Sequence, residues 1–221
     1  EMNGIRVLRL WTPSMPRTNL FLRGLEHFLV PIILFFGGLL SGRQDVVLIY
    51  SPPLPLGLAA YFLSRVRRMP FVVNIQDLFP KEAVILGLLK NKVLIRFFEL
   101  IEWFIYRNAN CITVHSPGNR EHVLAHGGSP ERTEVVHNWV DVEKIRPLPR
   151  ENAFRQEHGL NGRFVVSYAG TMGWCQDMPV IVEAAHRLQE YRDIVFLMVG
   201  DGPEKGRAEE HARQLGLTNM V

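Results

Sequence analysis

Two glycine-rich turns near the end of the sequence follow apolar runs and could bind a phosphate-bearing ligand. The first is Gly170-Thr171-Met172-Gly173, after "RFVVSYA", and the second is Gly200-Asp201-Gly202, after "DIVFLMV". Glycine lets backbone approach a ligand closely, and amide N–H groups in such a turn can bind phosphate oxygens. For each turn taken alone, the alternative is that it merely ends a strand. In that case the Asp201 carboxylate would form a hydrogen bond within its own turn and contact no ligand.

The absence of several sequence motifs argues against other classes of protein. Neither turn has the G-x-G-x-x-G spacing of a dinucleotide fold or the GK[ST] ending of a P-loop. The eight histidines show no H-E-x-x-H or related spacing, so the sequence predicts no metal site. Hydrolase chemistry lacks a G-x-S-x-G elbow. There is no basic run with interleaved aromatic residues, so we expect no nucleic-acid partner.

A second pair of candidate residues lies in the first half of the chain. Gln76 and Asp77 follow the apolar run "PFVVNI" and precede "LFP". Ligands of open αβ sheets bind outside the carboxyl ends of the strands, which is where these two residues would lie. A carboxylate there could orient a bound ligand. The alternative is that Asp77 caps a helix or fixes a turn.

Apolar runs of strand length alternate with segments of helical spacing along the whole chain. This alternation of strands and helices predicts parallel sheets covered by helices on both faces. The segment 93–109 has apolar residues on more than one side, so we expect that helix to be largely buried. The expected strands are 45–50, 70–76, 111–116, 133–141, 163–170 and 194–199, and the other expected helices are 58–68, 117–128, 176–191 and 203–216.

A polar, proline-containing segment at 142–150 separates two αβ runs, so we predict domains at 1–145 and 146–221. Residues 1–150 hold 18 Lys and Arg against 12 Asp and Glu, whereas residues 151–221 hold 7 against 10. The first part is therefore basic (+6) and the second acidic (−3), which indicates different partners. The chain starts at Glu1 and ends in "LGLTNMV", where a further strand would begin, so we expect a fragment with an incomplete second domain.

Several runs, taken in order, resemble the family 4 glycosyltransferases of the GT-B fold. They are "SPPLPLGLAAYFLSRVRRMPFVVNIQDLFPKEA", "TEVVHNWVDVEKIRP", "FVVSYAGTMGWCQDMPVIVEAA" and "VFLMVGDGPEKGR". The likeness is greatest to the bacterial surface-polysaccharide branch, which includes fucosamine-type transferases. It implies two Rossmann-like, doubly wound parallel-sheet domains, the first for an acceptor and the second for a nucleotide-diphosphate sugar.

The resemblance also implies a reaction and a site. A hexosyl-type transferase would move a sugar from a UDP-linked donor to a lipid-linked saccharide with retention, using no metal or other cofactor. Asp77 and Gln76 would be the catalytic residues, and the two glycine-rich turns, residues 170–173 and 200–202, would bind the donor. The enzyme would work in the cytoplasm, on the inner face of the plasma membrane. A UDP-sugar epimerase of the same fold and a non-catalytic nucleotide-sugar-binding subunit are the alternatives.

The sequence departs from the family pattern at several positions. Gln76 stands where the family often has His, and Thr171 where many members have Arg. The loop "GWCQD" offers no basic residue for the diphosphate. The paired glutamates of the family would follow Val221 and its first strand would precede Glu1, so we expect these 221 residues alone to be inactive.

Two features of the basic half predict contact with an anionic membrane surface. The apolar run 28–40, "FLVPIILFFGGLL", contains Pro31 and is too short to span a bilayer, so it is a core helix or a membrane-surface element. Arg65, Arg67 and Arg68 gather at one end of an expected helix. An apolar wedge combined with basic charge is typical of reversible surface attachment.

Overall fold

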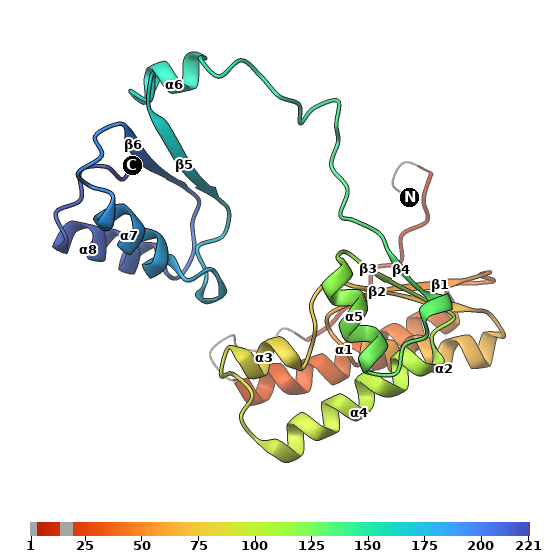
Figure 1. The fold of residues 1–221 in the computed structure, drawn as a ribbon. Coiled ribbons are helices and arrows are strands. Elements are labelled where there is room, and N and C mark those ends of the chain that lie inside the picture. The colour runs from red at the N-terminus through yellow and green to blue at the C-terminus, as the bar shows by residue number, and fades with distance from the viewer. Residues whose placement is uncertain (1–3, 14–19) are drawn as a thin grey trace. The chain divides into compact units, whose positions relative to one another are not determined.

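The structure, a computed structural model, describes residues 4–13 and 20–221 (Figure 1). The chain divides into two compact units, Glu1–Val140 and Asp141–Val221. Among the described residues, each unit contains its own sheet, with four strands in the first and two in the second. Residues 142–150 join the units without a helix or strand and are exposed throughout.

Unit 1 is built on a parallel sheet whose strands lie in sequence order. These strands are β1 (Val47–Ser51), β2 (Phe71–Ile75), β3 (Cys111–Val114) and β4 (Thr133–Val135). Every neighbouring pair is parallel, so each connection crosses over through a helix. The helices are α1 (Leu20–Leu40), α2 (Leu56–Arg67), α3 (Lys81–Ile85), α4 (Lys92–Asn108) and α5 (Pro117–Ala125), with a short 3₁₀ turn η1 (Pro130–Arg132) before β4.

The core of unit 1 forms where β2 meets the helices. Phe71, Val73 and Ile75 alternate along β2 and are each 1% exposed. They pack in one cluster with Ile105 of α4 and with residues of α2 and β3. Because the carboxyl ends of parallel strands share one edge of the sheet, this packing fixes where residues after β2 and β3 emerge.

Two sequence-based expectations in unit 1 are wrong. Helix α4 buries one face only, and Val93, Leu100 and Trp103 on it are 80%, 53% and 45% exposed. The last expected strand, 133–141, ends after three residues at Val135. The amide of Val136 still bonds to the carbonyl of Val114, the last residue of β3, and the next contact is made by a side chain, from His137 Nδ1 to the His115 carbonyl at 3.0 Å.

The apolar segment 28–40 belongs to α1, which contains Pro31. Pro31 and Gly37 are buried, whereas Ile32, Phe36 and Leu40 are exposed. Both interpretations of this run therefore find support, since one face is core and the other is apolar and uncovered. Among the helices of the described residues, none is long and apolar enough to cross a membrane.

Unit 2 has a smaller sheet in which β5 (Phe164–Ala169) pairs in parallel with β6 (Ile194–Val199). Met220 forms a further parallel bridge to Phe196 of β6. Helix α7 (Met178–Arg187) packs against α8 (Lys205–Gln214). The other elements are α6 (Ala153–Glu157) and the 3₁₀ turn η2 (Trp174–Gln176). The parallel αβ architecture that the alternation predicted is confirmed in both units. The expected cover on both faces of the sheet is not found at β1, where Leu48 and Tyr50 are 69% and 56% exposed.

Candidate functional site

The two glycine-rich turns of unit 2 lie side by side and are joined backbone to backbone. The Gly170 amide donates to the Val199 carbonyl at 2.9 Å, and the Met172 amide donates to the Asp201 carbonyl at 2.9 Å. The Glu204 amide then returns to the Met172 carbonyl at 3.0 Å. The β5–β6 pairing thus continues past both strands. The turns form one continuous rim at the carboxyl edge of the sheet.

Glycine is required at two places on this rim by the closeness of the backbones. A Cβ atom on Gly200 would lie 1.9 Å from the Gly170 carbonyl oxygen. A Cβ on Gly202 would lie 2.3 Å from the Met172 carbonyl oxygen. Both glycines also have positive φ, +159° and +154°. These glycines, which in the sequence suggested that a ligand could approach the backbone closely, are therefore required first by the packing of the two turns against each other.

The expected row of free amides at residues 171–173 is only partly present. The Met172 amide is used by Asp201, as above, and the Gly173 amide donates to the Gln176 side chain at 3.1 Å. The Met172 side chain is 4% exposed and fills the core rather than the rim. Among the three, the Thr171 amide has no partner in the described part of the chain. Thr171 itself is exposed.

The remaining residues of the rim have mixed roles. The Asp201 carboxylate accepts from the Gly202 amide at 2.9 Å, so it bonds to its own turn, as the alternative interpretation held. Asp177 is the residue before α7, but its side chain makes no capping bond and its backbone is left-handed. Trp174 is 70% exposed. The sequence did not single out Lys205, which begins α8 directly after Glu204 and is half-buried.

In unit 1, Gln76 belongs to a chain of polar side chains that spans β2 and β3. Its Nε2 donates to Asn74 Oδ1 at 2.6 Å, and Asn74 Nδ2 donates to Thr113 Oγ1 at 3.0 Å. The backbone N–H of Gln76 also donates to the Ser51 carbonyl at the end of β1. These contacts fix the orientation of Gln76 at the carboxyl edge and leave its Oε1 available to a ligand.

Asp77 is exposed at the same edge and does not cap a helix. Helix α3 begins at Lys81, and the residue before it is Pro80, with no side-chain cap. The amide of Leu78 is instead satisfied by Glu82 Oε1 at 3.0 Å. In the described part of the chain no hydrogen bond involves the Asp77 carboxylate. The helix-cap alternative is therefore wrong, and the carboxylate stays free to contact a ligand.

With this geometry in place, comparison with known proteins identifies the family. The sequence matches the glycosyl transferase 4-like domain over residues 1–139, which is more than half of the chain. The chain therefore belongs to the glycosyl transferase 4-like family. The matched residues make up nearly all of unit 1, and they include Gln76 and Asp77, which follow β2.

Curated relatives extend the likeness into unit 2. A probable glycosyltransferase of Pseudomonas aeruginosa, WbjE, is 28% identical over 90% of this chain and 51% of its own length. A putative colanic acid biosynthesis glycosyl transferase of Escherichia coli K12, WcaI, is 24% identical over 96% of this chain and 53% of its own. The chain thus spans about half the length of the curated relatives it matches.

Solved structures show the same fold at low identity. Anabaena HepE, in complex with UDP and glucose, aligns with a TM-score of 0.66 and 18% identity, covering 86% of this chain and 50% of HepE. Sucrose-phosphate synthase of Thermosynechococcus elongatus aligns with a TM-score of 0.69 and 15% identity, covering 94% of this chain and 51% of the synthase. The expected α/β fold of GT-B type, with parallel sheets, is confirmed.

Proposed function

We propose that the protein is a glycosyltransferase that moves a sugar from a UDP-linked donor to a lipid-linked saccharide in surface-polysaccharide synthesis, with retention at the anomeric carbon. The observation that carries the proposal is the rim of unit 2, where two glycine turns are joined backbone to backbone in a chain of this family. The names of WbjE and WcaI support the transferase class, and the name of WcaI supports the polysaccharide role.

Unit 2 is the proposed donor side, with Gly170, Thr171, Gly173, Gly200, Asp201 and Gly202 as its binding rim. Met172, which the sequence also suggested, is left out because its amide and its carbonyl bond to the neighbouring turn and its side chain is buried. The HepE complex with UDP and glucose is consistent with a UDP-sugar on this fold. The free Thr171 amide and the start of α7 would meet the diphosphate. The loop lacks Lys and Arg, and Lys205 at the start of α8 is the proposed cationic partner. These groups would stabilise the charge that develops on the leaving diphosphate.

Unit 1 is the proposed acceptor side, with Asp77 and Gln76 as catalytic residues. Asp77 offers an exposed carboxylate, and Gln76 is held by Asn74 and Ser51 at the same strand exit. A carboxylate there can accept a hydrogen bond from the acceptor hydroxyl and place it for attack, which is a positioning effect. This assignment predicts that Asp77 matters for chemistry more than for folding.

Transfer from radiolabelled UDP-sugars to lipid-linked acceptors, measured with the intact protein rather than with these 221 residues alone, tests the proposal. Asp77→Asn keeps the size of the side chain and should lower kcat by about 100-fold, because a misplaced acceptor hydroxyl can cost that much. Asp45→Asn, which changes another exposed aspartate before β1, should leave kcat unchanged. Wild-type rates with Asp77→Asn would exclude Asp77 from catalysis.

The same assay tests whether the reaction needs a metal ion. Activity that disappears in chelator and returns with Mg²⁺ or Mn²⁺ would contradict a reaction without metal.

An apolar groove between α1 and α2 supports contact with the membrane. Its volume is about 330 Å³. Every residue that lines it is apolar: Phe28, Pro31, Ile32, Phe35, Pro55, Leu58, Ala59 and Phe62. Arg65 and Arg68 are exposed at the end of α2, whereas Arg67 donates to the Leu39 carbonyl and ties α2 to α1. The proposed occupant is an anionic lipid surface, because the apolar face is accompanied by two exposed arginines.

Flotation with liposomes tests this surface, and the structure sharpens the choice of variants. Arg65→Ser with Arg68→Ser removes two exposed charges and spares Arg67. At about 1 kcal/mol for each charge, binding to anionic vesicles at low salt should fall about 30-fold. Arg187→Ser with Arg192→Ser removes two exposed charges from unit 2 and should have no effect. Equal binding to neutral and anionic vesicles, or to neither, would rule the surface out.

A further inference from the structure

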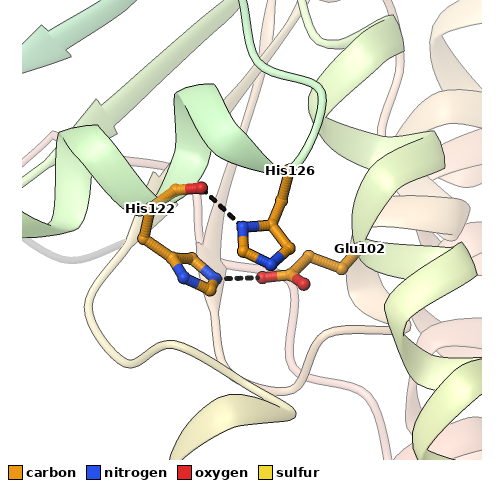
Figure 2. Close-up of side chains that lie close together, drawn as sticks. All are labelled: Glu102, His122 and His126. Atoms are coloured by element: carbon orange, nitrogen blue, oxygen red, sulfur yellow. Dashed lines mark hydrogen bonds and ion pairs between the residues drawn. The ribbon is translucent and has the colours of Figure 1, made fainter.

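Three side chains that could bind a metal ion come together in unit 1. They are Glu102 of α4, His122 of α5 and His126, the residue directly after α5 (Figure 2). One potential ligand atom from each residue lies within 4.8 Å of the other two. His122 and His126 are four residues apart, and His126 caps the carboxyl end of α5, so the two imidazoles lie close together at that end of the helix. Nothing in the reaction proposed above uses these residues.

Hydrogen bonds within the cluster hold the three potential ligand atoms close together. His122 Nε2 lies 2.9 Å from Glu102 Oε1. His126 Nδ1 lies 2.7 Å from the His122 carbonyl oxygen, so that nitrogen is the donor and Nε2 is left on the side of the carboxylate (Figure 2). A backbone carbonyl that fixes the tautomer in this way is the usual support of a metal-binding histidine. The two rings stack with centroids 3.9 Å apart.

Burial and a second hydrogen bond fix the carboxylate. Glu102 is 1% exposed and His122 is 9% exposed. The Tyr106 hydroxyl donates to Glu102 Oε1 at 3.0 Å. The carboxylate is therefore held toward the imidazoles by a neighbour that supports it.

The cluster can also be reached from solvent. It opens into a pocket of about 480 Å³ that α3 and α4 line together with the two histidines. His126 is half-buried at its edge. A tetrahedral ion held by three protein ligands would have its fourth position for a water from this pocket. Two imidazoles and one carboxylate suit Zn²⁺, whereas Mg²⁺ and Ca²⁺ prefer oxygen ligands alone.

We propose that Glu102, His122 and His126 bind one Zn²⁺ ion that joins α4 to α5. The alternative for the same contacts is a buried histidine–carboxylate pair that packs the helices without metal. The two differ in one measurable respect, because only the metal site requires Nε2 of His126. The proposal goes beyond the transferase assignment and does not depend on it, since the transfer reaction is proposed to proceed without metal.

Titration of the purified, untagged and metal-stripped 221-residue chain at neutral pH tests the site. Calorimetry with Zn²⁺ should give one ion per chain, and Co²⁺ should give the visible absorption of a tetrahedral complex. Mg²⁺ should not compete. Zn²⁺ should also raise Tm, because it binds the folded chain. No stoichiometric binding of Zn²⁺ would overturn the proposal.

Matched variants separate the metal site from the metal-free pair. His126→Gln removes one ligand at the half-buried edge and should weaken Zn²⁺ binding at least about 100-fold, more than the usual loss of a supporting residue. Tyr106→Phe should weaken it about 10- to 100-fold. His186→Gln, at an exposed position of α7, should bind like wild type. Circular dichroism without metal checks folding. Equal Zn²⁺ affinity in a folded His126→Gln variant would show that the cluster is only a packing contact.

Discussion

Gly200 approaches Gly170 so closely that a Cβ on residue 200 would lie 1.9 Å from the Gly170 carbonyl oxygen. The clash is with backbone, which cannot move aside as the end of a flexible side chain can. The two turns proposed to bind the donor therefore hold each other in place. A substitution at this contact should disturb the fold of unit 2 as well as any ligand on the rim.

Gly200→Ala should lower the free energy of unfolding by about 1–3 kcal/mol, because the left-handed φ and the clash both disfavour a side chain. Gly206→Ala is the matched control. That glycine lies in α8 with open space around it, and alanine there should be neutral or stabilising by up to about 1 kcal/mol. Urea unfolding of both variants measures the difference. A Gly200→Ala variant as stable as wild type would show that the turns can separate at no cost.

Gln176→Ala should increase affinity for UDP about fivefold if the Gly173 amide binds the diphosphate. In the structure that amide donates to Gln176 Oε1 at 3.1 Å, and a ligand would have to displace a bond that contributes about 1 kcal/mol. Calorimetric titration of the intact protein with UDP measures the change. Gln156→Ala, on exposed α6, should bind UDP as wild type does. Weaker binding by Gln176→Ala would contradict this and place the glutamine side chain on the ligand.

Glu82→Ala should destabilise unit 1 by about 1–2 kcal/mol, because the carboxylate satisfies the Leu78 amide directly after Asp77. Leu78 is only 6% exposed, so water cannot easily replace the lost acceptor. Glu82→Gln keeps an oxygen at the same reach and should retain most of the stability. Glu121→Ala, at an exposed position on α5, serves as the control for loss of charge. Equal unfolding free energies for the Ala and Gln variants would show that this bond is not needed.

The sequence predicted the elements well where a local pattern decides them. "FVVNI" forms β2, and the proline-containing segment 142–150 joins the two units as an exposed stretch. The helix over 93–109 was placed correctly as α4, but its burial was not. Val93 and Trp103 are apolar and exposed, and only tertiary packing decides which side of such a helix is covered.

The sites were harder to predict because they depend on contacts between distant segments. The glycine turns were visible in the sequence, which suggested that the amides of residues 171–173 would be free to bind a ligand. In the structure the Met172 amide donates to the Asp201 carbonyl instead. His122 and His126 have the four-residue spacing of the two histidines in H-E-x-x-H, so the expectation that no histidines show a related spacing is wrong. Glu102 lies 20 residues earlier on another helix, so no spacing rule connects it to them.

Gly57 of α2 and Ile105 of α4 should show strong energetic coupling. A Cβ on Gly57 would lie 2.5 Å from Ile105 Cδ1 and 2.8 Å from both Cγ1 and Cγ2. Gly57→Ala gains up to about 1 kcal/mol of helix propensity but overpacks the core, which costs about 1–3 kcal/mol. Because Ile105 is 1% exposed and has no space to move into, we expect the overpacking to dominate and the variant to be destabilised.

A double-mutant cycle tests this contact. Ile105→Ala alone should lose about 2–5 kcal/mol by leaving a cavity. Combined with Gly57→Ala, the new methyl group enters that cavity, so the loss in the double variant should be smaller than the two single losses together by about 0.5–3 kcal/mol. Gly118→Ala, which meets open space on α5, should combine with Ile105→Ala additively within about 0.5 kcal/mol. Additive losses for Gly57→Ala and Ile105→Ala in urea unfolding would show that α2 and α4 do not meet as closely as the structure has them.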